Sequence, residues 1–334
     1  MKLPEEIQFI ENSRMPQKTT TARLDGQVCI ITGATSGVGY ESAKRLAQAG
    51  AHLVLVCRNI EKVKRVKAEI TDRYNTEVNL VQADFSNLDD VRGAADRILR
   101  QYSAINILIN NAGVHLTKRT LTTEGFETVF CVNHLASFLF TRLLLERIIE
   151  TSSSRIIQVN SEGHRFGGLN LDDLHWKKRR YNGYKSYGAS KTAQLLTVWE
   201  LADRLKGSSV TINAVHPGAV ATNIGMNNGI LFQMYQKYLL FPFLKRPKIS
   251  GEVLYYFAAA PELNKTSGKF FNQTIEEKPA THALDRITGK RIWDISEELT
   301  GLTPESGIFD HDESVVEEGI PTVTPRSYST NLGT

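Results

Sequence analysis

Short apolar runs alternate along this chain with longer segments in which apolar residues recur every three or four positions. The runs lie at 27–32, 51–57, 77–83, 105–109, 155–159, 210–215 and 268–271. Nearly continuous short runs are typical of strands buried on both faces of a parallel sheet, and the periodicity between them is typical of helices. Two of these helices are long, at 121–149 and 184–205. The pattern predicts an α/β fold with one doubly wound parallel sheet of about seven strands and helices on both faces.

The same alternation defines the extent of the folded domain. It runs from about residue 23 to about residue 310 without a break, and a chain of 334 residues can build one domain with a substantial core. Residues 1–22 and 311–334 lack the periodicity and are rich in Thr, Ser, Pro and Glu. We therefore expect one domain over 23–310, between an N-terminal extension and a C-terminal tail that are both mobile.

Charge and cysteine content exclude several classes of function. The chain has 40 basic and 36 acidic residues, a balance that does not favour nucleic-acid binding. Cys29, Cys57 and Cys131 fall in predicted core segments without the spacing of metal ligands, so we expect no metal site and a reducing compartment. The first 17 residues lack the apolar centre of a signal peptide, and no uninterrupted apolar run reaches 18 residues. These features favour a cytoplasmic protein and leave peripheral membrane contact open.

A glycine-rich turn joins the first predicted strand to the first helix. It reads Gly33-Ala34-Thr35-Ser36-Gly37-Val38-Gly39, and a second strand follows the helix to complete a βαβ unit. Glycines at such a turn let the backbone approach a pyrophosphate at the helix N-terminus, where free N–H groups and the helix dipole favour anions. A tight turn without a ligand is the alternative, but the flanking strand and helix favour a Rossmann-type dinucleotide site.

A second pattern places a phenol beside an ammonium group. Tyr187 and Lys191 are four residues apart on the predicted helix 184–205, so their side chains share one helical face. A nearby cation favours the phenolate, which would allow Tyr187 to exchange a proton nearer neutral pH. Tyr and Lys at this spacing are also common on solvated helices. The pair indicates a catalytic site only in combination with the glycine turn.

Over roughly residues 24 to 305 the chain resembles the short-chain dehydrogenases/reductases. The family's motifs occur in order as Thr32-Gly33-x-x-x-Gly37-x-Gly39, Asn110-Asn111-Ala112-Gly113, Ser161, Tyr187-x-x-x-Lys191 and Pro217-Gly218. Softer similarities point to the retinol dehydrogenase branch, namely Tyr181-Asn182-Gly183, Gly268-Lys269-Phe270-Phe271 and Arg291-Ile292-Trp293. The lengthened segment of 26 positions between Ser161 and Tyr187 is similar to that branch, whereas many of its members carry an N-terminal membrane anchor that is not seen here.

The resemblance implies a role for each catalytic residue. Tyr187 would be the general acid in carbonyl reduction and the general base in alcohol oxidation, and Lys191 would lower its pKa and bind the nicotinamide ribose. Ser161, after the fifth strand, would hydrogen-bond the substrate oxygen; Ser154 competes with it but precedes that strand. Asn133 would link Lys191 through water to solvent, or would face a neighbouring helix as a structural amide. His164 and His216 are not required by this chemistry and are expected to be structural.

The cofactor implied is NADP(H). The second strand ends in Arg58 without the acid typical of NAD-preferring enzymes, and a guanidinium suits a 2′-phosphate; the alternative is a solvated arginine. Asp84 resembles an adenine contact or else caps the next helix. The remaining cofactor positions implied are those of the glycine turn and of the later motifs: Gly33, Ser36, Gly37, Val38, Gly39, Asn110, Gly113, Tyr187, Lys191, Pro217, Gly218 and Thr222.

Substrate selection is expected from residues 221–248, where the family builds a substrate lid. The segment 230–244 is rich in aromatic and aliphatic residues, which suits a lipophilic aldehyde, ketone or alcohol such as a retinoid, a steroid or a long-chain aldehyde. Packing on the core, a subunit interface and membrane contact are alternatives for this segment. The family also implies a homodimer through helices 121–149 and 184–205. The competing hypothesis for the whole chain is an NADP(H)-binding regulatory protein with little turnover.

Overall fold

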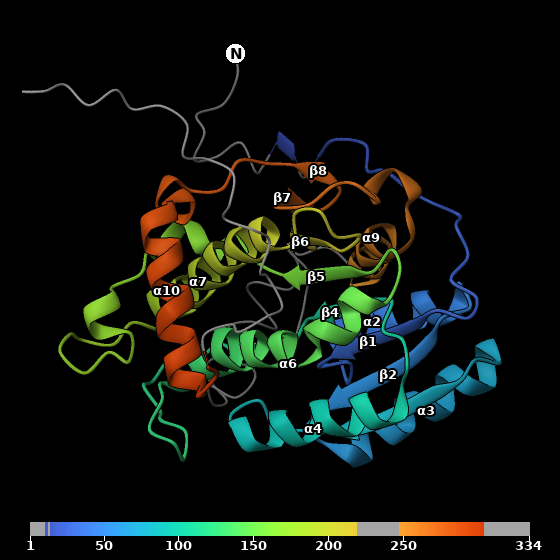
Figure 1. The fold of residues 1–334 in the computed structure, drawn as a ribbon, viewed down its shortest axis with the longest axis horizontal. Coiled ribbons are helices and arrows are strands. Elements are labelled where there is room, and N and C mark those ends of the chain that lie inside the picture. Colours follow the sequence, from blue (N-terminus) through green and yellow to red (C-terminus); the bar gives the residue numbers. More distant parts are fainter. Residues whose placement is uncertain (1–10, 13, 219–246, 304–334) are drawn as a thin grey trace, which may run out of the picture. The chain divides into compact units, whose positions relative to one another are not determined.

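A computed structural model describes residues 11–12, 14–218 and 247–303 and shows one eight-stranded sheet (Figure 1). The strand order is β3-β2-β1-β4-β5-β6-β7-β8, and β1 to β7 are parallel, while β8 is antiparallel to β7. The strands are β1 Val28–Thr32, β2 His52–Cys57, β3 Val78–Gln82, β4 Ile107–Asn110, β5 Arg155–Val159, β6 Thr211–His216, β7 Lys269–Asn272 and β8 Ile275–Glu276. The predicted doubly wound parallel sheet is confirmed, and the short β8 extends it by one strand.

Helices cover both faces of this sheet. The helices α2 (Gly37–Gln48), α3 (Ile60–Tyr74) and α9 (Lys248–Ala259) pack on one face, where β1 and β2 supply a continuous apolar core. The helices α4 (Leu88–Gln101), α6 (Ala136–Glu150) and α7 (Gly183–Arg204) belong to the other layer, and α10 (Arg286–Thr300) packs on α7 and α6. Because each sheet face is closed by helices, the central strands β1, β2 and β4 are almost entirely buried and mostly apolar, as the sequence pattern predicts.

One predicted helix boundary is wrong. The helix expected from residue 121 begins at Thr128 as α5 (Thr128–Phe130), continues through the π-turn η2 (Cys131–Leu135) and becomes α6. Residues 121–127 instead form a turn closed by a β-bridge between Leu121 and Glu127. The buried Glu127 carboxylate accepts hydrogen bonds from the backbone N–H groups of Val129 and Phe130, so it caps the helix at this point.

By length and composition alone, the helical segment Thr128–Glu150 could cross a membrane. Polar residues interrupt this segment, so it contains no uninterrupted apolar run of that length. In this structure 83% of its most apolar window is buried inside the domain. That burial, between the sheet, α4 and α10, accounts for its apolar character as a core helix.

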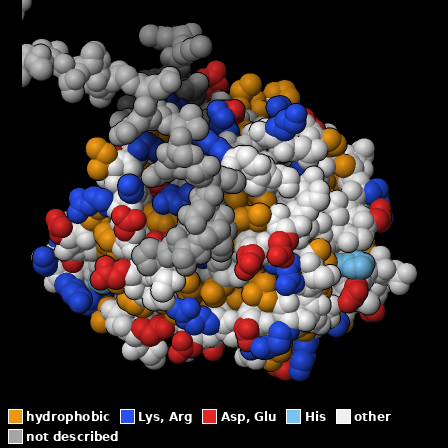
Figure 2. Space-filling view, viewed as in Figure 1, with side chains coloured by type: hydrophobic (Ala, Val, Ile, Leu, Met, Phe, Trp, Pro, Cys, Tyr) orange, Lys and Arg blue, Asp and Glu red, His pale blue; other side chains and the backbone are white. Residues whose placement is uncertain are grey.

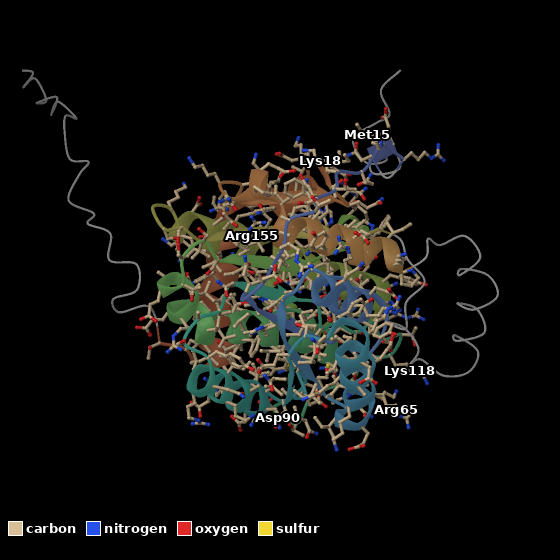
Figure 3. The ribbon with its side chains drawn as sticks, turned by 90° about the vertical axis from the view of Figure 1, so that its right-hand side faces the viewer. Met15, Lys18, Arg65, Asp90, Lys118 and Arg155 are labelled. Carbon is tan, nitrogen blue, oxygen red and sulfur yellow. The ribbon has the colours of Figure 1, made fainter. Side chains whose placement is uncertain are left out.

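The described residues of the N-terminal extension contact the domain. The Asn12 side-chain amide donates to Glu277 at 2.8 Å, and the Lys18 backbone N–H donates to the Thr274 hydroxyl at 2.8 Å. In Figure 3 Lys18 lies at the end of the domain opposite Arg65 of α3 and Asp90 of α4. The predicted tail at 311–334 lies outside the described residues.

Charged side chains of both signs are interspersed on the face seen in Figure 2. The chain as a whole has 40 basic and 36 acidic residues, so neither sign is in large excess. The visible part of this face therefore does not present a single-sign stripe of the kind that steers nucleic acids.

Candidate active site

The sequence-predicted site residues follow several different strands and meet at one edge of the sheet. Gly33 follows β1, Arg58 follows β2, Ser161 follows β5 and Pro217 follows β6. Carboxyl ends of parallel strands share one edge, and the strand order reverses between β1 and β4. This is the switch point at which open α/β sheets bind their ligands.

The glycine turn adopts backbone conformations that require glycine. Gly33 and Gly37 have positive φ values of 72° and 59°. A Cβ atom on Gly39 would lie 2.5 Å from both the Gly33 carbonyl oxygen and the Asn111 side-chain nitrogen. Ser36 is the N-cap of α2, and the first turn of that helix, Gly37-Val38-Gly39-Tyr40, carries no negative charge. The turn therefore brings uncharged backbone close to the space in front of the helix N-terminus.

Asn111, which the sequence analysis did not single out, braces this turn. Its side-chain amide donates to the carbonyl oxygens of Thr32 at 2.8 Å and Gly33 at 3.1 Å, and its backbone N–H donates to the Thr32 hydroxyl. The neighbouring Asn110 points instead toward α6 and donates to Thr141 at 2.7 Å. Of the two consecutive asparagines, Asn111 supports the glycine turn and Asn110 ties β4 to the helix behind it.

Arg58 and Asp84 lie beside each other after β2 and β3. The guanidinium Nη1 is 3.8 Å from an Asp84 carboxylate oxygen, and the two side chains are 65% and 33% exposed. Asp84 does not cap the next helix, because Asn87 occupies that position and accepts from the first-turn N–H groups. Instead, Asp84 accepts hydrogen bonds from the backbone and hydroxyl of Ser86. The helix-cap alternative for Asp84 is thus wrong.

Ser161 and Ser154 lie at opposite ends of β5. Ser161 is the N-cap of the short helix η3 (Glu162–Phe166), and its hydroxyl accepts from the Gly163 N–H at 3.1 Å. Ser154 is buried and donates to the carbonyl oxygens of Thr151 and Ile105. Only Ser161 therefore lies at the carboxyl edge, as predicted.

Tyr187 and Lys191 share one face of α7, and the Lys191 Nζ lies 5.6 Å from the centroid of the Tyr187 ring. A Cβ atom on Gly163 would come within 2.8 Å of that ring, so a glycine is needed where η3 meets the tyrosine. The Tyr187 side chain thus meets the segment that carries Ser161, as the resemblance implies.

Burial controls the protonation of this pair. Burial raises the pKa of Tyr187, and the hydrogen bond between Tyr187 and Ser161 acts in the opposite direction. The net shift is upward, contrary to the lowering expected from Lys191. The same burial lowers the pKa of Lys191, which is 3% exposed, to about 7. Both groups are therefore biased toward their neutral forms.

Asn133 lies in the π-turn that joins α5 to α6, a distortion common at functional sites. The side chain is fully buried, accepts from the Val114 N–H at 2.7 Å and donates to Ser190 at 2.9 Å. The Ser190 hydroxyl in turn donates to the Tyr187 carbonyl oxygen. Asn133 thereby ties the turn after β4 to α7, one residue before Lys191.

A residue missed by the sequence analysis, Gln194, joins Asn133 to Lys191. Its amide nitrogen donates to the Asn133 carbonyl oxygen, and its amide oxygen accepts from Lys191 Nζ at 3.0 Å. The available signal was its position three residues after Lys191, a polar side chain within the otherwise apolar turn of α7.

His164 is structural, as expected. The ring is fully buried, with Nδ1 2.8 Å from the Ser161 carbonyl oxygen, and Nε2 accepts from the Ala280 N–H. Burial lowers its pKa to about 3, so the imidazole is neutral and fixes the backbone behind Ser161.

The last predicted motif marks the edge of the described residues. Gly218 has a φ of 99°, and the carbonyl oxygen of Pro217 accepts from Ser250 of α9. Thr222, the greater part of the expected lid at 221–248 and the apolar segment 230–244 lie outside the described residues.

Comparisons with known proteins agree with this arrangement. Residues 27–229 match the family model for short chain dehydrogenases. Human retinol dehydrogenase 13 is 37% identical over 303 residues, which cover 89% of this chain and 91% of that protein. Mouse retinol dehydrogenase 12 is 38% identical over 285 residues, covering 85% and 89%.

Solved structures share the fold. A protein from Mycobacterium paratuberculosis is 28% identical with a TM-score of 0.69, covering 86% of this chain and 98% of that one. A short chain dehydrogenase from Shigella flexneri, solved in complex with NADP, is 20% identical with a TM-score of 0.61, covering 76% and 99%. The chain belongs to the short-chain dehydrogenase/reductase family and is an oxidoreductase similar to the retinol dehydrogenases.

Proposed function

We propose that this protein is an NADP(H)-dependent oxidoreductase that interconverts a carbonyl and an alcohol on a lipophilic substrate. The observation that carries the proposal is the meeting of Ser161, Tyr187 and Lys191 at the switch-point edge of the sheet, beside the glycine turn. A hydride transfer requires one proton donor or acceptor next to the reacting oxygen and a nearby dinucleotide site. This edge supplies the chemical groups for both.

The residues present fit a dinucleotide. The close approach at Gly39 would be filled by any Cβ atom, and the first turn of α2 offers uncharged N–H groups to a pyrophosphate. At the end of β2, Arg58 would hold a 2′-phosphate by charge-assisted hydrogen bonds, which supports NADP(H) over NAD(H). Asp84 and Gly113, near the ends of β3 and β4, would line the same side of the site. When bound, the cofactor supplies or accepts the hydride.

The protein's own residues manage the proton. Ser161 would hydrogen-bond the substrate oxygen and stabilise negative charge as it develops there. Tyr187 would donate its proton to that oxygen in reduction and accept it in oxidation. Because burial favours the neutral phenol, the donor form is the resting one at neutral pH, which suits reduction. Lys191 would bind the ribose hydroxyls and keep them next to the Tyr187 hydroxyl.

The substrate class rests on two observations. The matched relatives are named retinol dehydrogenases, and residues 230–244 of this chain are strongly apolar. A lipophilic aldehyde, ketone or alcohol of retinoid, steroid or long-chain type suits both. A cytoplasmic location with peripheral membrane contact stays a prediction.

A homodimer also stays a prediction, and α10 limits where it could form. Trp293 of α10 is 2% exposed, with its ring centroid 4.9 Å from that of Phe138 on α6. The Arg204 guanidinium of α7 lies 4.1 Å from the Trp293 ring, and Arg142 of α6 pairs with Glu297. In Figure 1 α10 lies against α7, so the side of α7 that faces α10 is occupied within the chain and is not open to a partner.

The competing function is an NADP(H)-binding regulatory protein with little turnover. Such a protein needs the glycine turn and Arg58, but it has no chemical need for the Ser161–Tyr187–Lys191 set. The presence of the complete set favours the enzyme.

The test measures NADPH oxidation with retinal, long-chain aldehydes and ketosteroids, for wild-type protein and Tyr187→Phe. We expect wild-type turnover on at least one lipophilic carbonyl and near-complete loss in the variant, with NADPH binding retained. Tight NADPH binding without turnover on any carbonyl would favour the regulatory protein. Full turnover by Tyr187→Phe would exclude Tyr187 as the proton donor.

A further inference from the structure

Gln194 occupies the space between the π-turn and Lys191, and all of its polar atoms are used there. It is 2% exposed and lies one helical turn after Lys191 on α7. Its amide oxygen accepts from Lys191 Nζ at 3.0 Å and from the Asn160 amide at 3.2 Å. Its amide nitrogen donates to the carbonyl oxygen of Asn133. A single side chain thus contacts three elements, η2, α7 and the end of β5.

These partners determine which way the amide faces. In the reverse orientation, the Gln194 NH₂ group would face the Lys191 ammonium and the Asn160 NH₂ group, which are both donors. It would also aim its oxygen at the Asn133 carbonyl oxygen. The hydrogen-bond network therefore permits one orientation, with the carbonyl directed at the lysine.

The second oxygen at Lys191 comes from the sheet. Lys191 Nζ donates to the Val159 carbonyl at 3.0 Å, at the end of β5, in addition to Gln194. Two of the three ammonium donors are directed at these oxygens, which orients the third. Among the residues that the structure describes, the titratable group beside Lys191 is Tyr187 on the same helix, while Asn133 and Asn160 contribute uncharged amides to the network.

We propose that Gln194 is a positioning residue for catalysis, whose side-chain carbonyl holds the Lys191 ammonium in place and stabilises its charge against burial. Unlike water, a primary amide does not readily pass a proton along, so Gln194 anchors Lys191 to the Asn133 carbonyl without exchanging its proton. The proposal rests on the proposed function for its catalytic consequence. Its effect on Lys191 itself is measurable without the cofactor.

Two variants of Gln194 separate the effect of its hydrogen-bond acceptor from the effect of its volume. Gln194→Leu keeps a similar volume but removes the oxygen, whereas Gln194→Glu keeps an acceptor and adds negative charge. Thr197→Val, one turn further along α7, is the matched control, because the Thr197 hydroxyl bonds only to helix carbonyls. Folding of each variant is verified by its thermal unfolding transition.

The first readout is the titration of Lys191 in cofactor-free protein, followed by NMR of lysine labelled with ¹³C at Cε and assigned with Lys191→Met. We expect the midpoint to fall by about one pH unit in Gln194→Leu and to rise by about one unit in Gln194→Glu, since the acceptor stabilises the ammonium. Thr197→Val should leave it unchanged. Unmoved midpoints in both Gln194 variants, or an equal shift in the control, would overturn the proposal. If Gln194→Leu does not fold, the direction of the shift in Gln194→Glu decides.

The second readout is the pH profile of NADPH-dependent turnover. Gln194→Leu should lower kcat about tenfold, the effect of one lost charge-assisted hydrogen bond, with little change in the KM for the carbonyl. A loss confined to KM, or an equal loss of kcat in Thr197→Val, would contradict positioning. Absence of turnover in the wild-type protein would refute the proposed function, while the NMR titration would still decide the role of Gln194.

Discussion

The glycine turn and the Tyr187–Lys191 cluster lie at the same edge of the sheet but are built in different ways. The turn is made of backbone: Gly33 and Gly37 have positive φ, and Gly39 leaves no space for a Cβ atom. The cluster is made of side chains, each held by partners on β5, η2 or η3. The glycine turn requires residues without a Cβ atom, whereas the Tyr187–Lys191 cluster requires particular hydrogen-bond partners. The two regions should therefore respond differently to substitution.

The largest effect is expected where chemistry depends on one hydroxyl. Ser161→Ala should lower kcat about 10²- to 10³-fold, because it removes a hydrogen bond to the developing charge on the substrate oxygen. It also removes the hydrogen bond that lowers the pKa of Tyr187, so the tyrosine limb of the pH–rate profile should move to higher pH. Steady-state kinetics at neutral pH measure the change in kcat, and a pH–rate profile extended above pH 10 follows the tyrosine limb. Ser154→Ala, at the other end of β5, is the control and should alter stability but not kcat.

In the backbone-built region a single methyl group should be damaging. Gly39→Ala should destabilise the protein by about 2–3 kcal/mol, since its Cβ would meet the Gly33 carbonyl oxygen at 2.5 Å. NADPH affinity should fall with it, because the turn must move. Gly93→Ala on α4 is the control: its Cβ meets only the end of Arg97 at 3.5 Å, and alanine should stabilise the helix by about 0.5–1 kcal/mol. Urea unfolding measures both; equal effects would refute a special conformation at Gly39.

Two buried histidines, His134 and His164, should make the stability of the protein depend on pH. Burial lowers the pKa of His134, which contacts Ser296 of α10, to about 3, as it does for His164 behind Ser161. A lowered pKa means that the unfolded chain binds more protons below pH 6.5, so stability is fully present above 6.5 and is lost as pH falls toward 3. Each histidine should cost about 1 kcal/mol between pH 6.5 and 5.5.

Urea unfolding at pH 7.5, 6.5 and 5.5 tests this for wild type and His134→Gln. The variant should lose less stability on acidification, because a glutamine at this position does not titrate. The same acid loss in both proteins would show that His134 is not the titrating group.

The smallest effect is expected at the exposed cation. Arg58→Ala should weaken NADPH binding about fourfold and leave NADH binding unchanged, because an exposed charge contributes less than a buried one. Fluorescence titration with each dinucleotide measures the difference. Equal losses for NADPH and NADH would refute a 2′-phosphate contact at this position.

Sequence patterns predicted elements better than they predicted contacts. The apolar runs located β1 to β7 within one or two residues, because burial on both faces leaves a continuous local signal. The start of the helix at Thr128 was missed, since the cap that defines it is a buried carboxylate whose role depends on its surroundings. Asn110 was preferred to Asn111 because nothing local tells which of two consecutive amides turns toward the glycines.

The sequence by itself determined the positions of the strands, the glycine turn and the one-turn spacing of Tyr187 and Lys191. Each of these three features depends only on residues that are neighbours in the chain. Only the tertiary structure decided that Gln194 reaches Asn133, 61 positions away, and that α10 covers the face of α6 and α7. It also decided the protonation balance at Tyr187, where burial raises the pKa more than the Ser161 hydrogen bond lowers it. Solvent exclusion and long-range hydrogen bonds arise from packing, and packing has no local signature in the chain.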